Sequence, residues 1–162
     1  MRKYLLWASA TLALLIAACG SSSPTSQASP TSSCINASAV HHAYVVVEHL
    51  AGTIVQRCVG FSGATIDGET LMKQSGLEYQ AQTFSGLGKA VCQLDNEPAQ
   101  FNTCFPQNQP YWSAFVETGG AWTSLPSTYT KANLHDHDAL GWNYVPATVT
   151  SPSPPPLATP ST

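Results

Sequence analysis

The sequence predicts a small α+β domain, a mostly antiparallel sheet with one short helix, flanked by two segments without regular structure. Runs rich in β-branched and aromatic residues recur through the middle of the chain, with turn residues between them. One short stretch carries helix-capping signals, and both flanking segments are rich in Ser, Pro and Thr. The folded part is expected to span residues 34–145, which is 112 residues and fits one domain.

The N-terminus has the three parts of a secretory signal. Arg2 and Lys3 form a positive start, residues 5–18 are an apolar run, and small residues precede Cys19. The apolar run has 14 residues, whereas a helix needs roughly 20 to cross a bilayer, so a spanning helix is the weaker interpretation. We therefore predict a signal peptide over residues 1–18.

Residues 16–19, Ile-Ala-Ala-Cys, resemble a bacterial lipobox, in which a cysteine thiol is acylated and becomes the new N-terminus. Ile16 stands where lipoboxes more often carry Leu. The resemblance implies diacylglycerol and an acyl chain such as palmitate on Cys19, because two or more chains anchor a protein stably where one is marginal. The alternative is an ordinary signal peptide with an incidental Cys19. We expect a lipoprotein on the extracytoplasmic face of the cell membrane.

The segments on either side of the domain are uncharged and lack apolar periodicity. After the lipidated cysteine, residues 19–33 form a Ser/Pro/Thr-rich tether that cannot bury enough surface to fold. Residues 146–162 are Pro-rich, and we predict a disordered tail that is either a cell-wall spacer or a frayed end.

The domain is acidic and sparsely charged. Between residues 34 and 145, four Lys or Arg residues stand against nine Asp or Glu residues, which gives a net charge near −5. Nucleic-acid binding needs a basic footprint, so this composition argues against a nucleic-acid partner. It argues equally against peripheral binding to anionic lipid head groups.

The chain has five cysteines, and an odd count in an exported protein leaves one thiol for a separate purpose. If Cys19 is lipidated, four cysteines remain, and four can pair in three ways. Disulfides are expected outside the cytoplasm. We pair Cys92 with Cys104, because they flank a loop rich in turn formers, which leaves Cys34 with Cys58. The absence of a CxxC spacing disfavours a zinc site.

The domain opens with a predicted β-hairpin. Residues 42–50 and 53–61 are rich in β-branched residues and are joined by a tight turn that contains Gly52. Further strand-like segments follow the helix described next. They are residues 77–84, 89–95, 111–118, 121–125 and 140–146.

A short helix is predicted in TIDGETLMKQSG, directly after the hairpin. Thr65 or Asp67 can cap its start, Leu71 and Met72 face inward, and Gly76 ends it. One helix inserted into a mostly antiparallel sheet is an α+β arrangement.

The order of these pieces resembles the transcobalamin-like C-terminal family, a β-grasp-like family often described in bacteria as a domain of unknown function. The matching pieces are the opening hairpin, TIDGETLMKQSGL, GKAVCQLDNEP, YWSAFVETGGAWTS and the closing ALGWNYV, which cover most of residues 45–145. The resemblance implies a β-grasp-like fold in a secreted or surface-anchored module. Because vertebrate relatives hold one face of cobalamin, it also makes a corrinoid or similar cofactor the leading ligand.

Aromatic residues supply the first candidate site. Three tryptophans lie in the domain, and aromatics dominate small cores, so two of the three are expected to be buried. An exposed one beside Tyr111 can stack on a planar ligand or a sugar. The loop at residues 97–112, held by the predicted disulfide at its base, is either a ligand rim or plain structure. The candidate ligand-binding residues are Tyr111, Trp112, Trp122 and Trp142.

A polar run supplies the second candidate site. Its members, His135, Asp136, His137 and Asp138, carry imidazole and carboxylate groups that suit zinc, copper or nickel. On an extended segment alternate residues point to the same side, so His135 and His137 can face one metal ion. The alternative, which we favour, is a solvated loop before the last strand.

The sequence offers no motif for catalysis. It contains no GxSxG, SxxK or HExxH pattern and no Gly-rich phosphate loop. The carboxylates of Asp95 and Glu97 fall in a turn, where capping or solvation is the simpler role. We expect a non-catalytic module that binds a small ligand or an envelope protein. The alternatives are a surface metal-binding protein and a structural or adhesive envelope component.

Overall fold

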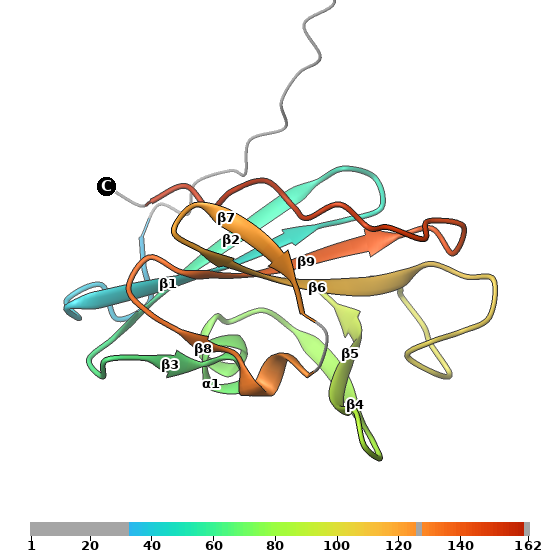
Figure 1. Ribbon diagram of the computed structural model, residues 1–162, viewed down its shortest axis with the longest axis horizontal. Coiled ribbons are helices and arrows are strands. Elements are labelled where there is room, and N and C mark those ends of the chain that lie inside the picture. Colours follow the sequence, from blue (N-terminus) through green and yellow to red (C-terminus); the bar gives the residue numbers. More distant parts are fainter. Residues whose placement is uncertain (1–32, 126–127, 161–162) are drawn as a thin grey trace, which may run out of the picture.

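The structure is a computed structural model that describes residues 33–125 and 128–160 of the chain. A five-stranded sheet with the order β2-β1-β9-β6-β7 lies at its centre, and the helix and two small two-stranded sheets lie on one of its faces (Figure 1). The elements are β1 (His41–Glu48), β2 (Ile54–Phe61), β3 (Ile66–Asp67), α1 (Gly68–Gln74), β4 (Tyr79–Phe84), β5 (Gly88–Leu94), β6 (Tyr111–Thr118), β7 (Ala121–Ser124), the 3₁₀ turn η1 (Tyr129–Lys131), β8 (Asn133–Leu134) and β9 (Ala139–Val145).

The predicted opening hairpin is confirmed. Strands β1 and β2 pair antiparallel from His41 opposite Phe61 to Glu48 opposite Ile54. Strand β1 also pairs with β9, and this pair is parallel. The first and last strands of the domain are therefore neighbours in the middle of the sheet, and the other pairs of this sheet are antiparallel.

The predicted helix is confirmed, and Asp67 rather than Thr65 is its N-cap. The Asp67 carboxylate accepts a hydrogen bond from the Thr70 amide at 2.9 Å and another from the Thr70 hydroxyl at 2.8 Å. Leu71 and Met72 are fully buried, as their inward orientation predicted. An ordered N-cap supplies a partner for one of the amides that a helix leaves unpaired.

Strands β4 and β5 form a separate two-stranded sheet instead of extending the main one. This hairpin leaves the main sheet on the side of α1, so a space remains between β5 and the face of β6 (Figure 1). The short pair β3–β8 and the turn η1 were not predicted from the sequence. They lie on the same side, where η1 contacts both α1 and β5.

The alternating pattern of the strands separates two faces of the main sheet. On the face that carries α1, a single cluster of buried side chains forms the main core, with Val45, Leu71, Leu140 and Trp142 among its members. The opposite face, which we call the second face, carries a smaller buried cluster of Tyr44, Cys58 and Ala139.

Both predicted disulfides are present, Cys34–Cys58 and Cys92–Cys104. The first ties the segment before β1 to the second face, and the second closes the loop between β5 and β6. No helix in residues 33–125 and 128–160 is long and apolar enough to span a bilayer. The predicted signal peptide and Cys19 lie outside the described residues.

The C-terminal segment differs from the predicted disordered tail. Residues 146–160 have no regular secondary structure, but they run along the second face, and Pro155 is buried there (Figure 1). The backbone of Thr159 makes two hydrogen bonds to the side chain of Gln56 on β2. The composition predicts poor core formation, yet a Pro-rich segment loses little entropy when it docks extended on a preformed surface.

Candidate functional site

A cavity of about 240 Å³ lies between the β4–β5 hairpin, strand β6 and the segment that leads into η1. Most of its lining is apolar, and large aromatic side chains form its walls. The side chains that shape it are Leu87, Phe105, Trp112, Leu125, Tyr129 and Trp142. They come from distant parts of the chain, and the cavity exists because the β4–β5 hairpin stands apart from the main sheet.

Trp112 on β6 forms one wall and is held from behind. Its indole Nε1 donates a hydrogen bond to the Glu97 carbonyl at 2.9 Å. Its ring packs on Tyr144, with centroids 4.7 Å apart, and meets the His49 ring edge-on at 5.9 Å. Because the Trp112 Nε1 is already bonded to the Glu97 carbonyl, the Trp112 ring contributes an apolar surface to the cavity.

Trp142 on β9 and Tyr129 on η1 form a second wall. Their rings meet edge-on with centroids 5.4 Å apart, and each residue is 2% exposed. Neither the Trp142 Nε1 nor the Tyr129 hydroxyl has a hydrogen-bond partner among the described residues. Burial raises the pKa of Tyr129, and the neighbouring Tyr79 phenol adds to the shift. A buried unpaired donor is costly, and both of these residues line the cavity.

The base of the cavity is a close contact between β5 and Thr128. The Thr128 hydroxyl accepts from the Lys89 amide at 3.1 Å and donates to the Lys89 carbonyl at 3.0 Å. Gly88 lies against this side chain with φ +87°, and a Cβ at Gly88 would come within 2.7 Å of the Thr128 Cβ. A glycine is therefore needed where the hairpin meets the segment before η1.

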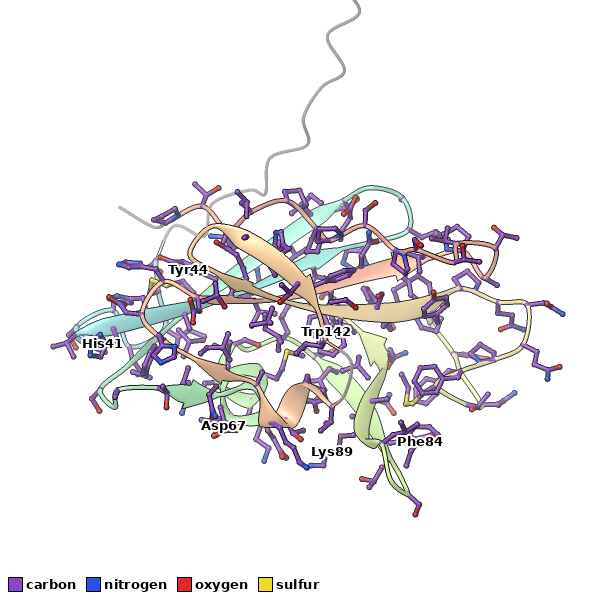
Figure 2. All side chains as sticks on the ribbon, viewed as in Figure 1. His41, Tyr44, Asp67, Phe84, Lys89 and Trp142 are labelled. Atoms are coloured by element: carbon purple, nitrogen blue, oxygen red, sulfur yellow. A yellow bond between two sulfur atoms is a disulfide. The ribbon has the colours of Figure 1, made fainter. Side chains whose placement is uncertain are left out.

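The rim of the cavity is apolar and open to solvent. Leu87, in the turn between β4 and β5, is 63% exposed, and Phe105, which directly follows the disulfide-bonded Cys104, is 50% exposed. Phe105 packs against Phe84, with ring centroids 5.4 Å apart. Figure 2 labels Phe84 on the β4–β5 hairpin. Large exposed apolar side chains that gather at a cavity mouth are typical of ligand-binding sites.

The structure brings together three of the four aromatic residues that the sequence singled out. Tyr111, Trp112 and Trp142 all line the cavity, although Trp112 and Trp142 are buried as core residues. Trp122 on β7 lies on the second face, packed against the cluster of Tyr44, and takes no part in the cavity. Sequence spacing could not show which of these aromatic residues share a face of the sheet, because the pairing of the strands determines the face that each side chain occupies.

Sequence reasoning missed Tyr129, Thr128 and Leu87. Tyr129 lies in a short 3₁₀ turn that has no apolar periodicity, so no local signal marks it. Leu87 lies between the predicted strands at residues 77–84 and 89–95, but nothing in its sequence showed that it lines a cavity together with Phe105. Phe105 lies within the loop that the sequence proposed as a ligand rim, and it does line the cavity.

The polar run before β9 forms a tight turn with two contacts between a histidine ring and a carboxylate. The ring of His135 lies 3.3 Å from a carboxylate oxygen of Asp138, and that of His137 lies 3.3 Å from Asp136. Asp136 also accepts from the His42 amide at 2.8 Å, which lowers its pKa. In the parts of the chain that the structure describes, no group of three or more His, Cys, Asp or Glu side chains is placed to hold a metal ion.

The turn carboxylates Asp95 and Glu97 flank one histidine. His49 Nδ1 lies 2.7 Å from Glu97 and its Nε2 lies 3.4 Å from Asp95. Glu97 also accepts from the Leu50 amide at 3.3 Å, which ties the β1–β2 turn to the loop after β5. Because Glu97 also accepts the Trp112 hydrogen bond through its carbonyl, this group positions the aromatic wall.

Comparison with known proteins gives little to identify the chain. It matches no protein-family model and no curated protein. A solved structure from Ruminococcus gnavus ATCC 29149, described as a "putative metal binding protein", resembles it with a TM-score of 0.46 and 17% sequence identity. The similarity covers 65% of this chain and 97% of that one. A likeness at this level does not transfer a ligand to this chain.

Proposed function

We propose that this chain is a non-catalytic binding module, anchored by lipid outside the cytoplasm, that takes a small, flat, mostly apolar molecule. The observation that carries the proposal is the cavity of about 240 Å³ with aromatic walls and an exposed apolar rim. Small-molecule sites are typically apolar concavities with a few polar groups that orient the ligand. The unpaired Trp142 Nε1 is such a group, so the ligand is expected to carry a hydrogen-bond acceptor.

The volume of the cavity limits the size of its ligand. An apolar cavity of about 150 Å³ accepts benzene, so 240 Å³ suits one or two fused rings. A complete corrinoid is far larger than this space. A corrinoid would have to rest on the rim at Leu87 and Phe105, and it is therefore the second candidate for the ligand.

We also propose a β-grasp-like build for the domain. The strand order supports this: an N-terminal hairpin is followed by one helix, and the last strand lies parallel to the first in the middle of the sheet. The strands β6 and β7 then continue the sheet beyond β9. The hairpin β4–β5 is an addition between helix and sheet, and it supplies one side of the cavity.

Two polar side chains beside the cavity, Thr128 and Lys89, are engaged in structural contacts, which supports a binding role over a catalytic one. The Thr128 hydroxyl is bonded to both backbone groups of Lys89, and the Lys89 ammonium pairs with Glu69. No histidine or cysteine is found among the described residues that line the cavity. A nucleophile with an adjacent base, the usual sign of covalent catalysis, is therefore not assembled there.

A thermal-shift screen of the full chain with Cys19→Ser tests the binding role. The probes are naphthalene, 2-naphthol, cyanocobalamin and Zn²⁺. We expect 2-naphthol to raise the melting temperature, because a ligand at about 100 times its Kd adds about 2.7 kcal/mol to the free energy of unfolding. A rise in melting temperature with Zn²⁺ alone would indicate metal binding in place of this proposal. A rise with cyanocobalamin alone would indicate that the ligand is a corrinoid that rests on the rim.

A matched pair of variants locates the probe. Leu87→Ala removes an apolar side chain from the rim, and Val40→Ala removes one that is 72% exposed and outside the cavity lining. We expect Leu87→Ala to weaken 2-naphthol binding several-fold and Val40→Ala to leave it unchanged. Equal effects of the two substitutions would place the probe elsewhere on the protein.

Membrane attachment is a separate part of the proposal, and it depends on Cys19. The support is the lipobox-like sequence at residues 16–19. In a bacterial host, Cys19→Ser should move the protein from the membrane fraction to the soluble fraction. Retention of the variant in the membrane fraction would contradict lipid anchoring at this residue.

A further inference from the structure

The second face of the sheet holds an extended Pro-rich segment, residues 146–160, which we call the strap. The strap crosses β6, β9 and β2 in turn: the Tyr111 hydroxyl donates to the Val149 carbonyl at 3.1 Å, and the Asn143 amide donates to the Ser153 carbonyl at 2.9 Å. It lies on the side opposite α1 (Figure 1), and Tyr111 is the residue that both contacts the strap and lines the aromatic cavity.

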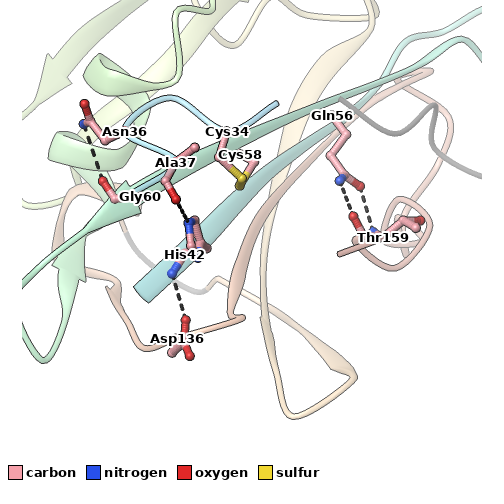
Figure 3. The surroundings of a disulfide bond; sticks show 9 residues. All are labelled: Cys34, Asn36, Ala37, His42, Gln56, Cys58, Gly60, Asp136 and Thr159. Carbon is pink, nitrogen blue, oxygen red and sulfur yellow. Dashed lines mark hydrogen bonds between the residues drawn. A yellow bond between two sulfur atoms is a disulfide. The ribbon is translucent and has the colours of Figure 1, made fainter. Parts of the chain in front are cut away.

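The firmest anchor of the strap is Gln56, which is 1% exposed on β2. Its side-chain amide donates to the Thr159 carbonyl at 2.6 Å, and its side-chain oxygen accepts from the Thr159 amide at 2.8 Å (Figure 3). A buried Gln that pairs with both backbone groups of one residue binds extended peptide backbone, and these hydrogen bonds do not depend on that residue's side chain.

Pro155 of the strap packs over Gly141 of β9, where the Trp122 ring of β7 also reaches. Gly141 has no side chain, and a Cβ there would lie 2.5 Å from the Trp122 ring and 2.9 Å from Pro155. Pro155 is buried against this position. An aromatic ring beside a flat glycine surface, with polar groups that bind carbonyls, is the arrangement by which proteins hold polyproline II segments.

The strap leaves polar atoms of this face without partners. Trp122 Nε1 and Glu117 Oε2 are both buried and unbonded among the described residues, and Glu117 is 7% exposed. Burial raises the pKa of the Glu117 carboxyl, against the opposing effect of the Ala158 and Gly120 amides. The resident segment is therefore an incomplete match, and a second copy of the same tail would leave the same atoms unpaired.

We propose that the second face is a peptide-binding groove for an uncharged, Pro-rich, extended segment of a partner protein, with the strap as its resident occupant. The backbone contacts of Gln56 and Asn143 and the proline site at Gly141 do not depend on the strap's own side chains. A partner segment that donates to Glu117 and accepts from Trp122 completes the hydrogen bonding, and so it displaces the strap.

The test cuts the strap after the protein has folded. A protease recognition site is inserted between the exposed residues Thr150 and Ser151 in the full chain with Cys19→Ser, and the chain is cut, diluted and freed of its tail by gel filtration. A fluorescent peptide of residues 151–162 is then titrated and its anisotropy measured. We expect saturable binding that Gln56→Leu weakens by about tenfold or more, because two backbone hydrogen bonds are lost. The matched substitution Gln80→Leu, on the separate β4–β5 hairpin, should have no effect.

A second peptide tests the partner's chemistry. In it Ala158 is replaced by Ser (Ala158→Ser), which offers a hydroxyl donor near Glu117, and we expect it to bind several-fold tighter. Equal or weaker binding of this peptide would contradict the proposal of a partner segment, and the chain's own tail would then be the natural occupant of the groove. A cut protein that unfolds, or whose tail never exchanges with the peptide, would show that the strap is a fixed part of the fold and would overturn the groove.

Discussion

The Trp142 side chain has two opposing effects on the stability of the fold. Its ring is part of the main core, and a buried ring of this size contributes strongly to stability. Its Nε1 is buried without a partner among the described residues, which costs free energy of folding. Trp112 shows the opposite arrangement, because its Nε1 is bonded to Glu97. Under the proposed binding role, a bound molecule would supply the partner that the Trp142 Nε1 lacks.

Trp142→Phe tests this role, because it removes the donor and keeps an aromatic wall. We expect 2-naphthol, which carries an acceptor oxygen, to bind about tenfold more weakly to the variant, whereas naphthalene should lose little affinity. Isothermal titration of both probes with both proteins gives the comparison. An equal loss for the two probes would mean that only the shape of the wall matters.

The β4–β5 hairpin shows how one element creates a site. Its turn presents Leu87, and its second strand meets the segment before η1 at Gly88. Gly86 and Gly88 both have positive φ, +81° and +87°, but only Gly88 is crowded. Substitutions at Gly86 and Gly88 can therefore distinguish the cost of backbone strain, which both share, from the cost of the contact with Thr128, which only Gly88 makes.

Gly88→Ala is expected to cost more than Gly86→Ala. Both replacements place a side chain at positive φ, which costs about 1 kcal/mol, and Gly88→Ala also drives a methyl group into Thr128 at 2.7 Å. We expect an additional loss of about 1–3 kcal/mol in the free energy of unfolding for Gly88→Ala, as for an overpacked core. Urea unfolding of the two variants measures the difference. Equal losses would show that Thr128 moves aside freely.

The helix α1 depends on its cap and on pH. Asp67→Ala should lower the free energy of unfolding by about 1 kcal/mol near neutral pH, because the Thr70 amide loses its partner. The hydrogen bonds from the Thr70 amide and hydroxyl lower the pKa of Asp67. A lowered pKa in the folded state means that this stabilisation is present above the unfolded pKa and is lost as the pH falls through the folded one.

The wild-type protein and Asp67→Ala are therefore expected to converge in stability at acid pH, below the ordinary carboxyl range. Asp67→Asn is the matched control, since an amide caps a helix at every pH. Urea unfolding at neutral and acid pH measures all three proteins. A gap between wild type and Asp67→Ala that stays constant with pH would contradict an ionised cap.

At the scale of the whole molecule, the two disulfides belong to different faces. Cys34–Cys58 joins the start of the domain to the second face, and Cys92–Cys104 closes the loop that carries Phe105 to the cavity rim. They close segments with sequence separations of 24 and 12, and each contributes about 3 kcal/mol on the chain-entropy model.

Removal of each disulfide should therefore have a similar effect on stability and a different effect on binding. We expect Cys92→Ala with Cys104→Ala to weaken 2-naphthol binding, because Phe105 loses its support. Cys34→Ala with Cys58→Ala should leave the affinity unchanged at temperatures where the variant is folded. Thermal unfolding and probe titration measure both quantities. If both pairs weakened binding alike, the rim would not depend on its local disulfide.

The sequence by itself determined the local pieces of this protein. The β1–β2 hairpin and the capped helix α1 follow from turn and capping residues, which act over short distances. The turn formers between Cys92 and Cys104 predicted that disulfide, and Cys34 with Cys58 was the pair that remained. The same holds for the Tyr-Trp strand β6, whose alternation is visible in Tyr111–Thr118. These predictions were confirmed because each depends on neighbours in the chain.

Where these elements meet depends on tertiary packing. The cavity joins Leu87, Trp112 and Trp142, and the strap joins Gln56 to Thr159, which are 103 residues apart. The face on which Trp122 lies depends on its pairing with β6, which its own sequence does not reveal. A contact between distant residues is determined by the packing of the whole sheet, and no local pattern of residues encodes it.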